Sequence, residues 1–447
     1  MSNGTAEAES GPLTRLLERL VDIKPDEVRA TLWAAAYFFF LFASYYILRP
    51  IRDQAGLAGG VRNLPWLFTG TMIAMLLVNP PFAALVAKLP RQKFVPLAYR
   101  FFILNLVVFY LLFTTQGEAS QVWIGRAFYI WTAVYNLFVV SIFWGFMADA
   151  FKSAQGKRLF GFIGAGGTLG TIVGSTLTAT LVTTVGAPAL LLVSGALLEV
   201  AVQCALALGR HLTIRHKGAA GPDRGTTAIG GGVMAGITHV IRSPYLLGIC
   251  GYMFLYTIGS TFLYFQQATL VDQALSDRAA QTQLFAKIDL AVNVLTIVIQ
   301  LFFTGRLLVW LGVAGGLMLV PAISVGGFLG LGFAPSIAML VAFLVLRRAG
   351  NYAVARPSRE VLYTVVGRED KFKAKSFIDT FVYRLGDQVG AWADPLLKAM
   401  GLGMTGIALV AAPIAGLWLV IGLWLGRRHA AAAARETTPG GEPLAAS

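Results

Sequence analysis

The sequence carries little charge for its length. Asp, Glu, Lys and Arg make up 13% of the 447 residues, whereas 56% are hydrophobic, and the mean hydropathy is +0.68. A soluble domain carries roughly 25% charged residues. Half of that charge leaves too little polar surface to cover a water-soluble globule. The composition therefore excludes a soluble protein and predicts insertion into a membrane.

Cysteine and histidine are also scarce. The two cysteines, Cys204 and Cys250, lie far apart within apolar stretches, where a cysteine behaves as a small buried hydrophobe. The four histidines do not have the spacing of metal ligands. We therefore expect no disulfide, no metal site and no cofactor.

The first 30 residues lack the basic charge of a signal peptide. Acidic side chains are scattered through them, so no cleavable signal is expected. Leucines recur at helical spacing over residues 13–20, with charged residues between them. This pattern predicts a short amphipathic helix on the membrane surface.

Twelve mostly apolar runs are long enough to cross a bilayer, which takes about 20 helical residues. They lie near residues 31–52, 65–87, 95–115, 121–148, 160–184, 187–209, 244–271, 281–304, 307–332, 335–356, 376–399 and 402–426. The eleventh run is the most polar, because Asp379, Arg384, Asp387 and Asp394 interrupt it. The expected fold class is an all-α membrane protein with twelve transmembrane helices.

Basic residues follow the even-numbered runs, whereas the odd-numbered exits are poorer in Lys and Arg. Because cytoplasmic loops carry an excess of Lys and Arg, this predicts a multi-pass protein of the bacterial cytoplasmic (inner) membrane with both termini in the cytoplasm. The same loops account for the net charge of +14 without a nucleic-acid partner.

The segment 210–243 is the one long polar linker between the runs, and it divides them six and six. Two six-helix halves joined in this way are the layout of the major facilitator fold. We expect a cytoplasmic N-terminal segment (1–30), an N-terminal half (31–209), a cytoplasmic linker (210–243), a C-terminal half (244–426) and a disordered tail (427–447). We also expect the protein to function as a monomer in the bilayer.

Arginines gather at the end of the first run. Tyr45, Arg49 and Arg52 are spaced i, i+4 and i+7, which places them on one helix face, and Asp53 follows Arg49 by four residues. A guanidinium group binds phosphate or carboxylate through two parallel hydrogen bonds. The pattern predicts anion binding, with Asp53 as an ion-pair partner. The alternative is that these side chains only mark the membrane interface.

The sequence Arg49-Pro50-Ile51-Arg52-Asp53 has an echo in Arg356-Pro357-Ser358-Arg359-Glu360. Each copy ends a predicted span, the first at the outer face of the membrane and the second at the inner face. Our hypothesis is that the two copies form charged gates at opposite ends of a cavity. In it, Arg356 binds the anion, and Arg359 and Glu360 form ion pairs.

Ionisable side chains in other spans are functional candidates, because a charge at membrane depth is costly unless it is paired or wet. Arg347 and Arg348 lie near the middle of span ten, so at least one is expected to face a water-filled cavity, and we assign Arg347 to anion binding. Ion pairing or proton coupling is assigned to Asp149, Asp289, Asp379, Arg384 and Asp387.

A static structural role is the alternative for each of these acidic and basic residues. Asp149 ends span four and could pair with Lys152. Asp289 begins a polar stripe that continues through Asn293, Thr296 and Gln300, which fits interhelical hydrogen bonding as well as substrate contact. The charges of span eleven could form a fixed network.

Glycines crowd the fifth run, at positions 161, 164, 166, 167, 170 and 174. No strand precedes them, so they do not predict a nucleotide-binding loop. Small residues at this density predict close approach between helices.

Several stretches resemble the ATP/ADP translocase family of nucleotide transporters. The end of span one, through Asp53, resembles that family's Ile-Leu-Arg-Asp-x-Lys-Asp element. Phe143-Trp144 and Ala148-Asp149 resemble its Phe-Trp-x-x-Ala-Asn-Glu stretch, followed here by Lys157-Arg158-Leu159-Phe160. The most extensive match runs from Asn351 to Gly390 and resembles its Asp-Pro-x-Lys-Glu-x-x-Tyr and Lys-x-Lys-x-x-Ile-Asp pattern. Together these stretches cover about a third of the chain.

The resemblance also shows where this sequence departs from the family. The family's lysine in span one corresponds to Arg52 and its glutamate in span four to Asp149, so both keep their sign. Its glutamate in span seven has no counterpart in the stretch 264–267, and its lysine in span eleven corresponds to Asp387. An inverted charge changes the preferred ligand charge by two units. The departure at Asp387 therefore argues against ATP/ADP exchange, but it is compatible with another anionic substrate.

The function expected is secondary active transport by alternating access, for an anionic solute such as a nucleotide or another phosphorylated metabolite. One alternative is a proton-coupled transporter of a drug-like, peptide or lipid-like compound. Remote alternatives are a membrane sensor without transport and a membrane enzyme. The histidine placement argues against an enzyme, because it provides no catalytic cluster at a membrane face.

Overall fold

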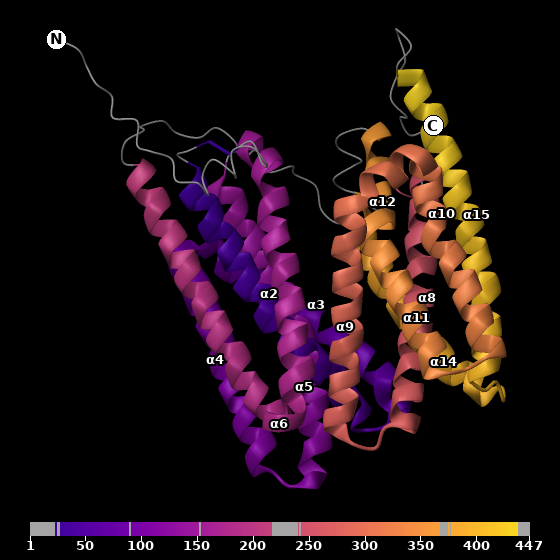
Figure 1. The fold of residues 1–447 in the computed structure, drawn as a ribbon, viewed down its shortest axis with the longest axis horizontal. Coiled ribbons are helices and arrows are strands. Elements are labelled where there is room, and N and C mark those ends of the chain that lie inside the picture. The colour runs from indigo at the N-terminus through magenta and orange to yellow at the C-terminus, as the bar shows by residue number, and fades with distance from the viewer. Residues whose placement is uncertain are drawn as a thin grey trace. The chain divides into compact units, whose positions relative to one another are not determined.

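The computed structural model describes residues 23–24, 27–88, 91–151, 153–216, 240, 243–366, 374–375 and 377–436, and the secondary structure in these ranges is almost entirely helical. The helices before the linker are α2 (Val28–Leu57), η1 (Val61–Asn63), α3 (Leu64–Lys88), α4 (Arg91–Thr115), α5 (Glu118–Ala150) and α6 (Ser153–His216). Those after it are α8 (Pro244–Ala274), α9 (Arg278–Phe302), α10 (Thr304–Phe333), α11 (Ile337–Gly350), η2 (Asn351–Ala355), α12 (Arg356–Leu362), η3 (Tyr363–Val365), η4 (Ile378–Val382), α14 (Tyr383–Ala399) and α15 (Met404–Glu436) (Figure 1).

The helices pack in two groups. The described residues of Met1–Arg52 and Ala74–Asp223 form the first group, and those of Asp53–Ile73 and Arg224–Ser447 form the second. The end of α2, η1 and the start of α3 thus pack with the helices that follow the linker. The predicted domain boundaries remain predictions.

Ten helices in the described ranges are long and apolar enough to cross a membrane. One of them, α6, is broken at Gly186, whose φ of 79° and ψ of 158° are not helical. That break falls between the predicted spans 160–184 and 187–209. The predicted eleventh span corresponds to η4 and α14, which are not among the ten. When α6 is counted as two spans and η4 with α14 as one more, the helices account for all twelve predicted spans.

Glycines let α6 lie directly against α2 in the first group. A Cβ atom on Gly170 would lie 2.2 Å from the carbonyl oxygen of Phe39, and one on Gly174 would lie 2.4 Å from that of Ala43. By contrast, a Cβ atom on Gly164 would meet nothing within 4 Å. The predicted packing role is therefore confirmed for the later glycines of the run, since no larger residue fits there.

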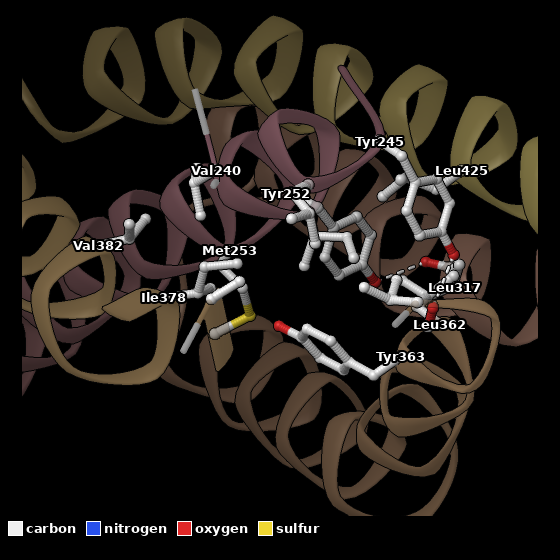
Figure 2. Close-up of a cluster of buried hydrophobic side chains, with 14 of the residues drawn as sticks. Val240, Tyr245, Tyr252, Met253, Leu317, Leu362, Tyr363, Ile378, Val382 and Leu425 are labelled. Carbon is white, nitrogen blue, oxygen red and sulfur yellow. Dashed lines mark hydrogen bonds between the residues drawn. The ribbon is translucent and has the colours of Figure 1, made fainter. Parts of the chain in front are cut away.

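Tyrosines tie α8 to its neighbours in the core of the second group (Figure 2). The hydroxyl of Tyr252 donates to the carbonyl oxygen of Leu317 in α10 at 2.8 Å, and that of Tyr245 donates to Leu362 O at the end of α12 at 2.9 Å. A buried hydroxyl needs such a partner, because no water competes for it inside an apolar bundle. These bonds fix α8 against both neighbouring helices.

Two glycines bring α14 against α8. A Cβ atom on Gly386 would lie 1.8 Å from Thr257 Oγ1, and one on Gly390 would lie 2.8 Å from Thr261 Cβ. The polar helix α14 thus packs closely along α8, which places its charged residues beside that helix.

Some predictions fall outside the described residues. These are the amphipathic helix near residues 13–20, most of the linker (217–239), the tail after residue 436 and the side chain of Asp149. The polar stripe of α9 is buried at Asp289, Asn293 and Thr296, whereas Gln300 is exposed.

Candidate functional site

Among the described residues of the second group, Arg347 is the most buried arginine, with 3% of its surface exposed. It lies in the last turn of α11, and each of its nitrogens donates a hydrogen bond. Nε donates to Ser324 Oγ at 3.0 Å, Nη1 to Ser260 Oγ at 2.9 Å and Nη2 to the carbonyl oxygen of Tyr256 at 3.1 Å. The guanidinium is therefore held rigidly by α8 and α10.

Two aromatic rings complete the surroundings of this guanidinium. Its Cζ lies 5.2 Å from the centre of the Tyr256 ring and 5.7 Å from that of the Trp418 ring, which is cation–π range. Among the described residues, no carboxylate forms an ion pair with Arg347. Its charge is thus stabilised by neutral oxygens and ring faces, and it is not neutralised.

The neighbouring arginine is neutralised. Arg348 Nη1 lies 2.8 Å from Asp289 Oδ1 in α9, and the side chains are 17% and 4% exposed. Of the two roles open for Asp289 in the sequence, it therefore takes at least the interhelical one. The pair leaves Arg347 as the uncompensated charge of the two.

A row of hydroxyl groups lies along α8, and it was not predicted from the sequence. Tyr252, Tyr256, Ser260 and Tyr264 are spaced by four residues, so they form a polar row on an otherwise apolar helix. Besides Ser260, which holds Arg347, the Tyr256 hydroxyl accepts from Asn351 Nδ2 at 3.0 Å. Their four-residue spacing could have predicted this polar row. The apolar residues around them, however, indicate only a buried helix.

The segment Asp53–Ile73 meets α8 and α14 in a group of polar and aromatic contacts. We call Asp53, Thr69, Tyr264, Gln388 and Trp392 the rim cluster. Tyr264 OH donates to Asp53 Oδ1 at 3.2 Å, Thr69 Oγ1 to Gln388 Oε1 at 2.9 Å, and Trp392 Nε1 to Thr69 Oγ1 at 3.1 Å. The cluster joins the end of α2 and the start of α3 to the two helices.

Two charges predicted in span eleven contact each other. Arg384 Nη1 lies 3.5 Å from Asp387 Oδ2, and Thr261 Oγ1 lies 3.3 Å from Asp387 Oδ1 and 3.0 Å from the carbonyl oxygen of Thr257. Both distances to Asp387 are at the long end of their ranges. Asp387 is thus paired loosely, in contrast to Asp289.

The second arginine–proline copy forms the start of α12. Arg356 is exposed, Arg359 Nη1 lies 2.8 Å from Met253 Sδ, and Glu360 forms an ion pair with Lys375. Asp379 is exposed in η4. Lys375 is an ion-pair partner that the sequence assignment did not include.

The first group holds the predicted residues of span one. Arg49 Nη1 donates to Tyr46 OH at 3.4 Å, and Arg52 Cζ lies 5.0 Å from the centre of the Tyr129 ring. The Tyr45 ring lies 6.4 Å from that of Tyr135. Aromatic rings, which favour cations, therefore lie beside both arginines.

A further ion pair of the first group was also missed. Glu27, directly before α2, is 3% exposed and accepts from Gln155 Nε2 at 2.7 Å and from Arg158 Nη2 at 3.1 Å. The backbone N–H of Lys24 donates to its other oxygen. Burial raises the pKa of Glu27, but these hydrogen bonds and the charge of Arg158 outweigh it, so the pKa lies below its ordinary value.

No protein-family model and no curated protein matches the sequence. Solved structures do match the fold. A mutant form of the nucleoside transporter NupG aligns with a TM-score of 0.64 at 11% identity, over 89% of this chain and 99% of that one. An auto-inhibited POT family peptide transporter aligns at 0.60 and 15% identity, over 94% and 99%. A bacterial homologue of the human lysosomal transporter Spinster aligns at 0.50 and 14%, over 92% and 96%.

The chain adopts the major facilitator fold. The matches cover both helix groups, since they include about nine tenths of the chain. The predicted fold class is thereby confirmed, and the chain is a multi-pass membrane protein. At 11–15% identity the likeness establishes the fold alone, and the major facilitator fold does not by itself select a solute.

Proposed function

We propose that this protein is a secondary transporter that carries an anionic solute by alternating access. The observation that carries the proposal is the buried, uncompensated charge of Arg347. Taking an ion out of water costs several kcal/mol even after relaxation, and hydrogen bonds to neutral groups offset only part of that cost. An anion that binds beside Arg347 would offset the rest.

The shape of the guanidinium favours phosphate or carboxylate. Arginine presents donors in a planar fork that matches the paired oxygens of these groups. Three of its five N–H donors are fixed by Ser260, Ser324 and Tyr256, so the group is preorganised and two N–H donors are left for an anion. In this fold, substrate sites lie near the middle of the membrane, where Arg347 is expected.

A nucleotide or another phosphorylated metabolite is the proposed substrate. The resemblance to ATP/ADP translocases supports a phosphorylated solute, as do Arg49, Arg52 and Arg356, which we assign to anion binding. One protein of similar fold is named as a nucleoside transporter. The charge inversion at Asp387 favours a solute with fewer negative charges than ATP.

The rim cluster is the proposed outer gate. Alternating access needs contacts that close one end of the cavity and can break. The hydrogen bonds of 2.9–3.2 Å from Thr69, Tyr264 and Trp392 can break in this way, because a single hydrogen bond contributes only about 1 kcal/mol. The ion pair between Glu360 and Lys375 is the corresponding candidate at the inner end. The positive-inside pattern supports this assignment of ends.

A proton-coupled transporter is the second candidate, and Asp387 is the observation that favours it. Its contacts with Arg384 and Thr261 are long, so a proton could replace them at little cost. Asp289 fits this role less well, because Arg348 holds it at 2.8 Å. Asp149 remains a candidate from its sequence position.

Counterflow in proteoliposomes tests the proposal. Vesicles are preloaded with unlabelled ADP, ATP, inorganic phosphate or adenosine, and the same labelled compound is added outside. We expect accumulation of at least one phosphorylated compound above protein-free vesicles, and less accumulation of neutral adenosine. Accumulation of adenosine alone would contradict an anionic substrate. Accumulation that requires an inward proton gradient would favour the second candidate.

A further inference from the structure

The helix that carries Arg347 is interrupted directly after it. α11 ends at Gly350, η2 forms a π-helical turn and α12 begins at Arg356. The backbone N–H of Arg356 donates to the carbonyl oxygen of Asn351, five residues earlier instead of four. Turns of this kind widen the helix and occur frequently at functional sites. The break therefore changes the direction in which Arg356 and Arg359 leave the helix relative to Arg347.

Pro357, the second residue of α12, cannot donate a backbone hydrogen bond. A proline has no backbone N–H, and in a continuous α-helix that group would donate to the carbonyl four residues earlier. If the helix were continuous, that residue would be Ala353, which is fully buried. Its carbonyl oxygen must find a donor within the protein, because an unsatisfied carbonyl in an apolar interior is costly.

Thr304 supplies that donor from another helix. It is the first residue of α10, and its Oγ1 lies 3.0 Å from the carbonyl oxygen of Ala353 and 3.2 Å from that of Ile299. The hydroxyl has one proton, and the shorter contact is with Ala353. Serine and threonine side chains commonly satisfy carbonyls freed by proline in membrane helices.

The turn that carries Thr304 has exposed apolar side chains on its outer side. Leu301 is 71% exposed and Phe302 63% exposed, and with Phe303 and Arg306 they line an open hollow of about 540 Å³. The residues of η2, by contrast, are mostly buried. The bond to Ala353 thus joins the start of α10 to the buried segment at the break.

We propose that Thr304 is a positioning residue, whose hydroxyl holds the break at η2 and so sets the placement of Arg356 and Arg359 relative to Arg347. The inference rests on the proposed transport function only for its effect on transport rate. Because the partner of the carbonyl is one side chain on another helix, the break can bend without unfolding α11 or α12. Thr304 makes the bend rigid when its bond is formed.

Hydrogen exchange of the backbone amides over residues 354–362, in detergent or nanodiscs, tests the bond without any substrate. Thr304→Val keeps the size of the side chain and removes the donor, and Thr304→Ser keeps the donor. We expect Thr304→Val to raise the exchange rate about tenfold and Thr304→Ser to leave it within about twofold of wild type. No change in Thr304→Val would overturn the proposal.

Pro357→Ala provides the decisive background, because alanine returns the N–H that donates to Ala353 O once the turn becomes α-helical. In this background Thr304→Val is expected to change the exchange rate less than about twofold. An equal effect in both backgrounds would show that Thr304 acts by packing and would overturn the proposal. If Thr304→Val alone does not fold, folding of the double variant supports the proposal and its failure contradicts it.

The effect on transport is measured in the same variants by counterflow of labelled ADP. We expect Thr304→Val to lower the maximal rate and raise KM, and Pro357→Ala to make the rate insensitive to Thr304→Val. Normal kinetics in Thr304→Val would remove the positioning role even if the amides exchange faster. If wild type accumulates none of ADP, ATP and inorganic phosphate, the proposed function fails, whereas the exchange result still decides whether Thr304 holds the break.

Discussion

The guanidinium of Arg348 lies 2.8 Å from Asp289 Oδ1, whereas Arg347, the preceding residue of the same helix turn, forms no ion pair within the described part of the chain. Adjacent positions of a helix face in different directions, so one side chain reaches α9 and the other reaches α8 and α10. The fold thus neutralises the charge of Arg348 and leaves that of Arg347 without a carboxylate partner among the described residues.

Asp289→Asn is expected to destabilise the protein by about 3 kcal/mol, because it leaves Arg348 largely buried without its counter-charge. Thermal unfolding in detergent measures the loss. The matched control is Glu199→Gln, which removes a carboxylate from the exposed ion pair with Arg100 and is expected to cost less than about 1 kcal/mol. Equal effects of the two substitutions would contradict a structural role for the pair.

Thr69→Val is expected to open the rim cluster, because it removes the hydrogen bonds to Gln388 and Trp392. The measurement is labelling of a cysteine at Ser260 by a membrane-impermeant thiol reagent added outside, with Cys204 and Cys250 replaced. Two lost bonds predict a rise of about tenfold in the labelling rate.

The control for this experiment is Thr114→Val, because Thr114 is exposed and bonds only to carbonyls of its own helix among the described residues. It is expected to leave the labelling rate unchanged. An unchanged rate in Thr69→Val as well would show that the rim cluster does not limit access from the outside.

Glu27 makes stability depend on acid pH. Its pKa in the folded protein lies below the ordinary value of 4.5, so its carboxylate contributes stability that is fully present above that pH and is lost as the pH falls through the folded pKa. The difference in melting temperature between wild type and Glu27→Gln is therefore expected to shrink below about pH 4.5. A difference that stays constant down to about pH 3 would contradict the ion pair with Arg158.

Gly170→Ala is expected to disrupt the packing of α6 on α2, because its Cβ would lie 2.2 Å from the carbonyl oxygen of Phe39. Overpacking of this kind costs about 3 kcal/mol or more when backbone must move. Gly164→Ala, on the same helix, has open space around its Cβ and is expected to be neutral or slightly stabilising. Melting temperatures of both variants decide the point, and equal values would contradict the close contact.

Much of the fold could be predicted because the membrane restricts the choices. Apolar runs of sufficient length must be helices there, and even the break at Gly186 fell between two predicted runs. The helix α14 was the weakest prediction, since its charges hide its role, and only the structure shows that Gly386 and Gly390 hold it against α8. Sequence patterns carry no information on which helix accepts such a contact.

The candidate site was predicted less completely. Arg347 was selected because a charge near mid-span is unusual, but its partners Ser260 and Tyr256 lie about 90 residues away in the sequence. Hydroxyl residues are common in membrane helices, so nothing local distinguishes those that meet an arginine. The π-turn at η2 was missed for a similar reason, because Pro357 predicts a break but not its form or its partner Thr304.

The most direct test of an anion site at Arg347 compares Arg347→Gln and Arg347→Lys in counterflow of labelled ADP, beside wild type and the exposed control Arg100→Gln. Loss of charge-assisted hydrogen bonds predicts a decrease of about tenfold to a hundredfold in Arg347→Gln, partial activity in Arg347→Lys and full activity in Arg100→Gln. A folded Arg347→Gln protein that transports ADP at the wild-type rate would contradict the account, because the buried charge would then have no part in recognising the anion.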